Sequence, residues 1–100
     1  MDLDQMRSNA GAAANLLKSI ANETRLLILC TLANGERSVG GLNQSIKLSQ
    51  SALSQHLAIL RREGLVQTRR ESQTIYYSLA PTDALRVIET LHDIYCSPGC

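Results

Sequence analysis

Residues 49–66 read SQSALSQHLAILRREGLV, and this segment carries the most clearly marked helix of the chain. Three leucines recur at the spacing that puts them on one face of an α-helix: Leu53, Leu57 and Leu60. Ser49 is a favourable N-cap, because its hydroxyl oxygen accepts a hydrogen bond from a backbone amide in the first turn of the helix. At the other end, Gly64 can adopt a left-handed conformation without strain, and Leu65 can pack back on Leu60. The stretch therefore predicts a helix at residues 50–63.

The other segments predict a mainly α-helical chain with one small β-hairpin. Apolar spacing, caps and turn residues place further helices at residues 6–20, 22–34, 38–46 and 81–96, and strands at residues 66–70 and 74–79. Pro81 suits the first turn of the last helix. The second strand alternates between an inward and an outward set: Ile75, Tyr77 and Leu79 against Tyr76 and Ser78. Between the strands, residues 71–73 lack an Asn-Gly or Asp-Gly pair, so we expect a loose loop.

This order of elements is that of a winged helix-turn-helix: five helices with a two-stranded wing. The helix-turn-helix covers residues 38–63, with Lys47 and Leu48 in its turn, and the wing covers residues 65–79. A chain of 100 residues that is 44% hydrophobic is expected to fold as a single domain, residues 1–100.

Composition also excludes several classes of protein. The longest wholly apolar run, residues 26–30, is far shorter than the roughly 20 residues that cross a bilayer, and the N-terminus lacks a signal-peptide core. We therefore expect a cytoplasmic protein without membrane contact, whose thiols (Cys30, Cys96 and Cys100) are not a permanent disulfide framework. No Gly-rich phosphate loop, carboxylate pair or Ser/His/Asp order is present, so we expect neither an enzyme nor a bound cofactor.

The net charge of +1 hides an uneven distribution. Residues 1–46 are neutral, whereas residues 47–70 carry five basic side chains and one acidic one, a net charge of +4. Residues 71–100 carry a net charge of −3. Positive charge is thus concentrated where contacts with DNA phosphates would release counterions. An ordinary solvated face is the alternative interpretation.

The exposed face of the helix at residues 50–63 is polar but nearly uncharged, which is unusual for a merely solvated face. Its side chains can exchange hydrogen bonds with base edges in the major groove of double-stranded DNA, and we predict base contacts from Gln50, Ser51, Ser54 and Gln55. We predict contacts with the DNA backbone from Lys47, Ser49, His56, Arg61, Arg62, Arg69 and Arg70. For His56, a packed or capping role is an equal alternative.

The segment at residues 49–66 resembles the recognition segment of the ArsR/SmtB family of homodimeric bacterial repressors. Residues 22–29, NETRLLIL, resemble the second helix of that family, and residues 74–79, TIYYSL, resemble its second wing strand. The resemblance implies a homodimer formed by the first and last helices, residues 6–20 and 81–96. Two apolar stripes agree with it: Ala10, Ala13, Leu17 and Ile20, and Leu85, Ile88, Leu91, His92 and Tyr95.

The sequence departs from the metal sites of this family. Residues 38–40 are Ser-Val-Gly where a Cys-x-Cys cluster would lie, and Asp83 lacks the histidine that would follow it. The positions of Cys30 and Cys96 resemble instead the HlyU/BigR subgroup, which implies sensing of a persulfide or oxidant through linkage of the two thiols. Spacing alone leaves a structural role open, because Cys30 lies in an apolar run and a helix C-terminus disfavours a thiolate at Cys96.

We therefore predict a repressor whose affinity for operator DNA is lowered when a small sulfur or oxidant effector links Cys30 and Cys96. Two alternatives stay open. A metal-responsive repressor would use His92, Cys96 and Cys100, although no full ligand set is evident. An antirepressor would use the same fold to compete with another DNA-binding protein.

Overall fold

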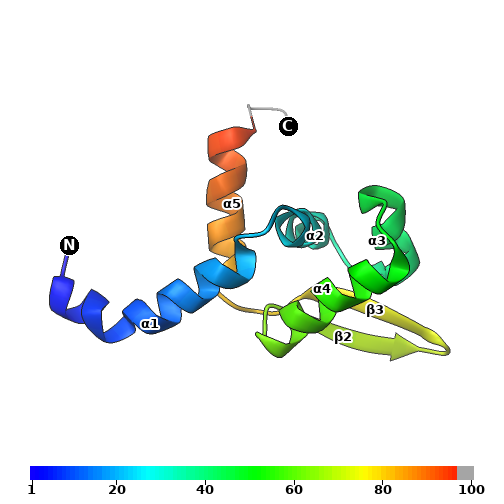
Figure 1. Cartoon of the computed structure of the whole chain (residues 1–100), viewed down its shortest axis with the longest axis horizontal. Coiled ribbons are helices and arrows are strands. Elements are labelled where there is room, and N and C mark those ends of the chain that lie inside the picture. Colours follow the sequence, from blue (N-terminus) through cyan, green and yellow to red (C-terminus); the bar gives the residue numbers. More distant parts are fainter. Residues whose placement is uncertain (97–100) are drawn as a thin grey trace.

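The computed structural model describes residues 1–96 and has the predicted winged helix-turn-helix order (Figure 1). Its elements are α1 (Leu3–Ile20), α2 (Glu23–Ala33), β1 (Arg37–Ser38), α3 (Val39–Ile46), α4 (Gln50–Arg62), β2 (Val66–Glu71), β3 (Thr74–Leu79) and α5 (Ala84–Tyr95). The fold class predicted from sequence is confirmed, with one addition. The short strand β1, which the sequence pattern did not predict, makes the sheet three-stranded.

The ends of α4 are fixed by the residues that the sequence singles out. The backbone amide of Ala52 donates to the Ser49 hydroxyl at 3.2 Å, which caps the N-terminus. At the C-terminus Gly64 has a φ of +77°, and the amides of Gly64 and Leu65 donate to the carbonyls of Arg61 and Leu60 at 3.0 and 2.9 Å. These two hydrogen bonds form a Schellman motif, which stops the helix and starts β2.

The sheet has the strand order β1-β3-β2, with both pairs antiparallel. The pairing of Glu71 with Thr74 leaves only Ser72 and Gln73 between the strands, so the expected loose loop was wrong. Ser72 takes a φ of +55°, which supplies the left-handed residue that a two-residue hairpin requires. The prediction that Ile75 points into the core was also wrong, because this side chain is 43% exposed. Ile75 lies near the turn of the hairpin, beyond the core that Tyr77 and Leu79 contact.

The core lies where α2, α3 and α4 meet the base of the hairpin. Its fully buried side chains come from these three helices: Ile28, Leu29, Leu42, Leu53, Leu57 and Leu60. Tyr77 and Leu79 of β3 pack against this cluster. Apolar burial of this kind is the main source of stability, so α4 is held rigidly by one face while the opposite face is free to bind.

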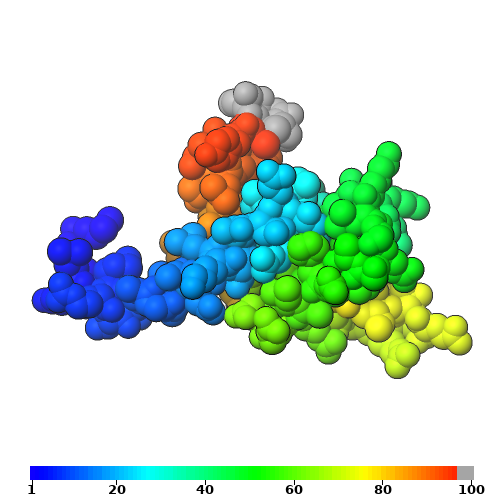
Figure 2. Space-filling view, in the orientation of Figure 1, coloured from blue at the N-terminus to red at the C-terminus, as the bar shows by residue number. Residues whose placement is uncertain are grey.

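Two helices extend away from this core, as Figures 1 and 2 show for the first half of α1 and the far end of α5. Every residue of α1 before Ala13 is exposed. The Cα radius of gyration is 14.7 Å, above the roughly 13 Å expected of a compact domain of 100 residues.

The predicted apolar stripes of α1 and α5 differ in part from the faces that the structure buries. In α1 the partly or fully buried positions are Ala13, Leu16, Ser19 and Ile20, whereas Leu17 is 57% exposed. In α5 they are Ala84, Val87, Ile88 and Leu91, whereas Leu85, His92 and Tyr95 are exposed. The helix begins at Ala84, so Pro81 precedes it and does not form its first turn. Within residues 1–96, no helix has both the length and the apolar content needed to span a bilayer.

Candidate nucleic-acid interface

The exposed face of α4 carries the predicted base-contacting residues. Leu53, Leu57 and Leu60 have no exposed surface, and the side chains that point the other way are all exposed: Gln50, Ser51, Ser54, Gln55 and Ala58. The Ser49 and Ser51 hydroxyls lie 3.5 Å apart at the start of the helix. This face offers hydroxyl and amide groups that both donate and accept, beside a small alanine that permits close approach.

Basic side chains flank this face at both ends of α4. Lys47 precedes the helix in a left-handed conformation, with a φ of +53°, and Arg61 and Arg62 occupy its last turn. Arg62 lies 3.8 Å from the Glu63 carboxylate, at the long end of ion-pair distance, and the Arg62 side chain is 73% exposed, so solvent weakens this pair. No carboxylate of residues 1–96 lies within ion-pair distance of Lys47, Arg61 or Arg70. These three cations are therefore available to an external anion.

Arg69 differs from its neighbour Arg70. Its guanidinium donates to both carboxylate oxygens of Glu36 at 2.7 Å and to Glu71 at 2.8 Å. It also stacks on the ring of Tyr76, with 4.6 Å between the Arg69 Cζ atom and the ring centroid. The Arg69 hydrogen bonds hold the pKa of the Glu36 carboxyl below its usual range. Arg69 thus already has anionic partners within the protein.

His56 occupies the boundary between the two faces of α4. It is half-buried, and its Nδ1 atom is buried without a hydrogen-bond partner among residues 1–96. The buried nitrogen points to a packed ring rather than to a side chain fully extended into solvent. Its predicted backbone contact stays a prediction, and only the exposed part of the ring can make it.

Cys30 lies in α2, on the wall of a cavity of about 490 Å³ between α2 and α5. The cavity is lined by Cys30, Ala33, Asn34, Leu85, Ile88, Glu89, His92 and Asp93. The half-buried thiol therefore shares a cavity with His92, and burial raises the pKa of the Cys30 thiol above its ordinary value. Cys96 is the C-cap of α5 and donates its backbone amide to the His92 carbonyl at 2.7 Å.

The metal alternative involves a residue outside the described part of the chain. Cys100 is this residue, since the structure describes residues 1–96. Within residues 1–96, no group of three or more His, Cys, Asp or Glu side chains is arranged to hold a metal ion. The carboxylates and His92 that line the Cys30 cavity thus do not form such a ligand set.

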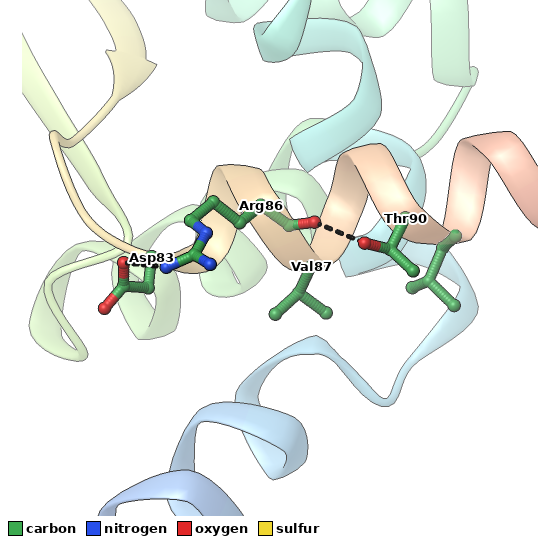
Figure 3. A pocket seen from close by; sticks show the side chains of 5 residues that line it. Asp83, Arg86, Val87 and Thr90 are labelled. Atoms are coloured by element: carbon green, nitrogen blue, oxygen red, sulfur yellow. Dashed lines mark hydrogen bonds and ion pairs between the residues drawn. The ribbon is translucent and has the colours of Figure 1, made fainter.

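Apolar surface lies along the projecting helices, away from α4. A shallow depression of about 450 Å³ is lined by Asp83, Arg86, Val87, Thr90 and Leu91 of α5 (Figure 3). In it Thr90 donates to the Arg86 carbonyl at 2.9 Å, and Asp83 lies 3.6 Å from Arg86. A second depression, lined mainly by apolar side chains of α1, α2 and α5, shares Val87 and Leu91 with the first. Leu85, Ile94 and Tyr95 are exposed on the same helix.

Sequence reasoning missed one residue near the interface, Glu36. It lies between α2 and β1 and is 33 positions from Arg69, so no local periodicity links the two. A lone acidic residue after Asn34-Gly35 carries no signal of a partner in the wing. The pair is visible only once β1 is placed beside β3.

Comparison with known proteins agrees with this geometry. Residues 22–68 match the family described as bacterial regulatory protein, arsR family. The transcriptional activator HlyU of Vibrio cholerae is 55% identical over 96 residues, which cover 96% of this chain and 89% of that protein. The structure of reduced HlyU from Vibrio cholerae covers 93% of this chain and 98% of its own, with a TM-score of 0.87.

Two further structures are similar over most of the chain. The transcriptional repressor BigR from Xylella fastidiosa is 41% identical, with a TM-score of 0.91 and coverage of 97% of this chain and 99% of its own. A homodimeric winged helix-turn-helix DNA-binding domain from Mycobacterium bovis is 32% identical, with a TM-score of 0.78 and coverage of 91% and 84%. The chain therefore belongs to the arsR family of bacterial regulatory proteins, and is a DNA-binding transcriptional regulator with a winged helix-turn-helix fold.

Proposed function

We propose that this chain is a sequence-specific repressor that binds operator DNA as a homodimer, with α4 in the major groove and the wing beside the phosphates. The observation that carries the proposal is the exposed, uncharged polar face of α4 between Lys47 and Arg61, neither of which has an ion pair within residues 1–96. In this proposal four side chains contact bases: Gln50, Ser51, Ser54 and Gln55. Backbone contacts come from Lys47, Ser49, His56, Arg61, Arg62 and Arg70. Arg69, for which the sequence predicts the same contact, is left out of this proposal because Glu36 and Glu71 hold its guanidinium.

The proposed dimer interface consists of residues 6–20 and 81–96. Its support is the apolar surface that a single copy leaves uncovered, at Met6, Leu17, Leu85, Ile94 and Tyr95. The homodimeric neighbour from Mycobacterium bovis supports the same assembly. Two copies related by a two-fold axis would present two α4 helices to successive major grooves, which predicts an operator with two half-sites about one helical turn apart.

Selection of duplexes from a random library, followed by fluorescence anisotropy with the selected duplex, tests sequence-specific binding. Gln55→Ala is expected to reduce discrimination between selected and scrambled duplexes by about tenfold, since one bidentate base contact contributes about 1–3 kcal/mol. Gln67→Ala, an exposed glutamine on β2, is the matched control and is expected to bind as the unaltered protein does. Failure to enrich any sequence would contradict the proposal.

We further propose that linkage of Cys30 with Cys96 lowers operator affinity. One thiolate attacks the sulfane sulfur of a hydropersulfide, RSSH, and becomes a protein persulfide while RSH leaves. The second thiolate then attacks the inner sulfur of that persulfide, which gives the disulfide and releases H₂S. The two thiols are oxidised by two electrons, and the sulfane sulfur is reduced to sulfide. Transfer of further sulfur atoms before closure would give a polysulfide bridge.

The support for this switch is the position of Cys30 on the cavity wall between α2 and α5. A bridge from Cys30 to the end of α5 would fix that helix against α2, and α5 belongs to the proposed dimer interface. The similarity to HlyU, one structure of which is described as reduced, is consistent with sensitivity to oxidation.

Treatment with an organic hydropersulfide, followed by mass spectrometry and anisotropy, tests the switch. The expected product has lost two hydrogens, has gained whole sulfur atoms in addition where a polysulfide joins Cys30 and Cys96, and binds the selected duplex more weakly. Cys30→Ser and Cys96→Ser are expected to bind DNA but to be insensitive. Unchanged affinity after complete linkage would disprove the switch, and Zn²⁺ binding in equilibrium dialysis that also changes affinity would favour the metal alternative.

A further inference from the structure

The hydrogen bonds of Arg69 form a cluster on the outer face of the sheet. One guanidinium makes three hydrogen bonds of 2.7 to 2.8 Å to two carboxylates, and its Cζ atom lies over the ring of Tyr76. The contact with Glu36 is bidentate, which is the geometry that fixes both the position and the orientation of an arginine. An isolated surface ion pair contributes little, but a bidentate pair within a network is the exception to that rule.

The strand register shows what this cluster connects. Tyr76 of β3 lies opposite Arg69 of β2 on one side and Ser38 of β1 on the other. Side chains directly opposite one another share a face of the sheet, so Arg69 and Tyr76 lie on the same face. Glu36, two residues before Ser38, reaches Arg69 and so spans the central strand. The pair thus ties the segment that leads from α2 into β1 to the far edge of the wing.

Backbone pairing at this edge is short. The strand β1 contains only Arg37 and Ser38, whereas β2 and β3 pair over six residues. Few ladder hydrogen bonds therefore hold the wing to the helix-turn-helix beyond the buried base of the hairpin. The Glu36–Arg69 pair crosses β3 and therefore restrains the position of the wing where the two-residue ladder between β1 and β3 provides few hydrogen bonds.

Arg69 and Arg70 differ in the charge of their surroundings. Arg69 lies between two carboxylates, so its cluster has a net charge of −1 and a phosphate approaching it would meet Glu36 and Glu71. Arg70 pairs with Ile75 in the register and therefore lies on the opposite face of the hairpin. Arg70 has no ion pair within residues 1–96.

We propose that Glu36 and Arg69 form a latch that holds the wing in position for DNA, and that Arg70 rather than Arg69 is the wing contact with phosphate. Both latch members are positioning residues. The role in DNA binding rests on the proposed function, whereas the restraint of the wing applies to the free protein as well.

The latch and a direct phosphate contact predict opposite outcomes for Glu36→Gln. If Glu36 holds Arg69 in place, removing its charge loosens the wing and weakens binding to the selected duplex by about five- to tenfold. If Arg69 contacts phosphate, the same change releases a cation and strengthens binding. For the latch, Arg69→Met is expected to weaken binding at least as much as Glu36→Gln, because it also loses the contacts with Glu71 and Tyr76. The double variant is expected to bind no more weakly than Arg69→Met alone, because the pair is already lost in that variant.

Two comparators complete the test. Arg69→Lys keeps the charge but loses the bidentate fork, so the latch predicts that it behaves as Arg69→Met, whereas a phosphate contact predicts near-normal binding. Arg70→Met is expected to reduce the slope of log K against log salt by about one for each wing in contact, whereas the latch variants leave this slope unchanged. A reduced slope in Arg69→Met, or tighter binding by Glu36→Gln, would overturn the proposal.

Hydrogen exchange on the free protein separates the latch from the proposed function. In Glu36→Gln, the amides of residues 66–79 are expected to exchange faster while those of α4 are unchanged, which also shows that the variant is folded. Unchanged exchange in the wing would overturn the latch even if DNA binding is confirmed. If the unaltered protein selects no duplex, the proposed function and the positioning role for DNA both fail, whatever the exchange shows.

Discussion

Two regions of the molecule differ in how completely their apolar residues are buried. One is the recognition end, which consists of α4 and the wing, and the other consists of the projecting helices α1 and α5. In α4 the three leucines of the inner face have no exposed surface. In α5, Leu85, Ile94 and Tyr95 are 39%, 64% and 81% exposed. Both helices are amphipathic, but α5 buries only part of its apolar residues against its own chain, chiefly Ala84 and Ile88.

This difference separates two tasks. A reading helix needs a fixed orientation before it meets DNA, because base contacts depend on exact hydrogen-bond geometry, and complete burial of one face provides it. The uncovered apolar surface on α1 and α5 belongs to the proposed dimer interface, where a second copy would bury it. Stability at one end should therefore depend on the single chain, and at the other on protein concentration.

The largest effect is expected from a cavity beneath α4. Leu57→Ala replaces a fully buried side chain and should lower the free energy of unfolding by about 2–5 kcal/mol. The folded protein loses the burial of the deleted methyl groups and keeps a cavity in their place. Urea unfolding followed by circular dichroism, at one fixed protein concentration, measures it. Ser54→Ala, on the exposed face of the same helix, should change stability by less than about 0.5 kcal/mol. Equal effects of the two substitutions would contradict the burial assigned to the inner face.

A second substitution tests the other side of the comparison. Ile94→Glu places a charge on exposed apolar surface and should raise the dimer dissociation constant at least about thirtyfold, while the fold of each copy persists. Sedimentation equilibrium measures this constant. The matched control is Ile75→Glu, the same change at a 43% exposed isoleucine on the wing, which should leave the dimer intact. If Ile94→Glu dimerises normally, α5 does not form the interface.

Local signals are enough to predict the recognition end. The cap at Ser49, the leucine spacing and Gly64 all lie within residues 49–66, so each boundary of α4 depends on its near neighbours. The hairpin strands follow from alternation for the same reason. The turn at Ser72 and Gln73 was missed because serine supplied the left-handed conformation that glycine or asparagine usually provides.

Long-range pairing explains what could not be predicted. β1 has two residues, too few for a periodic signal, and its partner lies about forty positions away in β3. The ion pair between Glu36 and Arg69 depends on that pairing. The sequence alone therefore predicted the same phosphate contact for Arg69 as for Arg70. In α5, the apolar residues that pack on the core and those left exposed occur in one short helix, and periodicity alone does not separate the two sets.

Cys30 lies where the core meets a projecting helix, because its cavity is bounded by α2 on one side and by α5 on the other. Its reactivity therefore reports how well α5 covers α2. Burial raises the pKa of its thiol above the ordinary 9.0, and only the thiolate is nucleophilic. In Cys96→Ser/Cys100→Ser, iodoacetamide should therefore alkylate Cys30 more slowly when folded than in urea at neutral pH. The folded rate should rise as the pH passes above 9.0.

The raised pKa of the Cys30 thiol also makes the free energy of unfolding depend on pH. Above pH 9.0 the thiol of the unfolded chain ionises before that of the folded chain, so Cys30 lowers the free energy of unfolding as the pH rises. Cys30→Ser should remove this part of the pH dependence. Leu85→Ala, which opens the α5 wall of the cavity, should speed alkylation because water then reaches the thiol. Equal rates in folded and urea-unfolded protein would show that α5 does not cover Cys30 in solution.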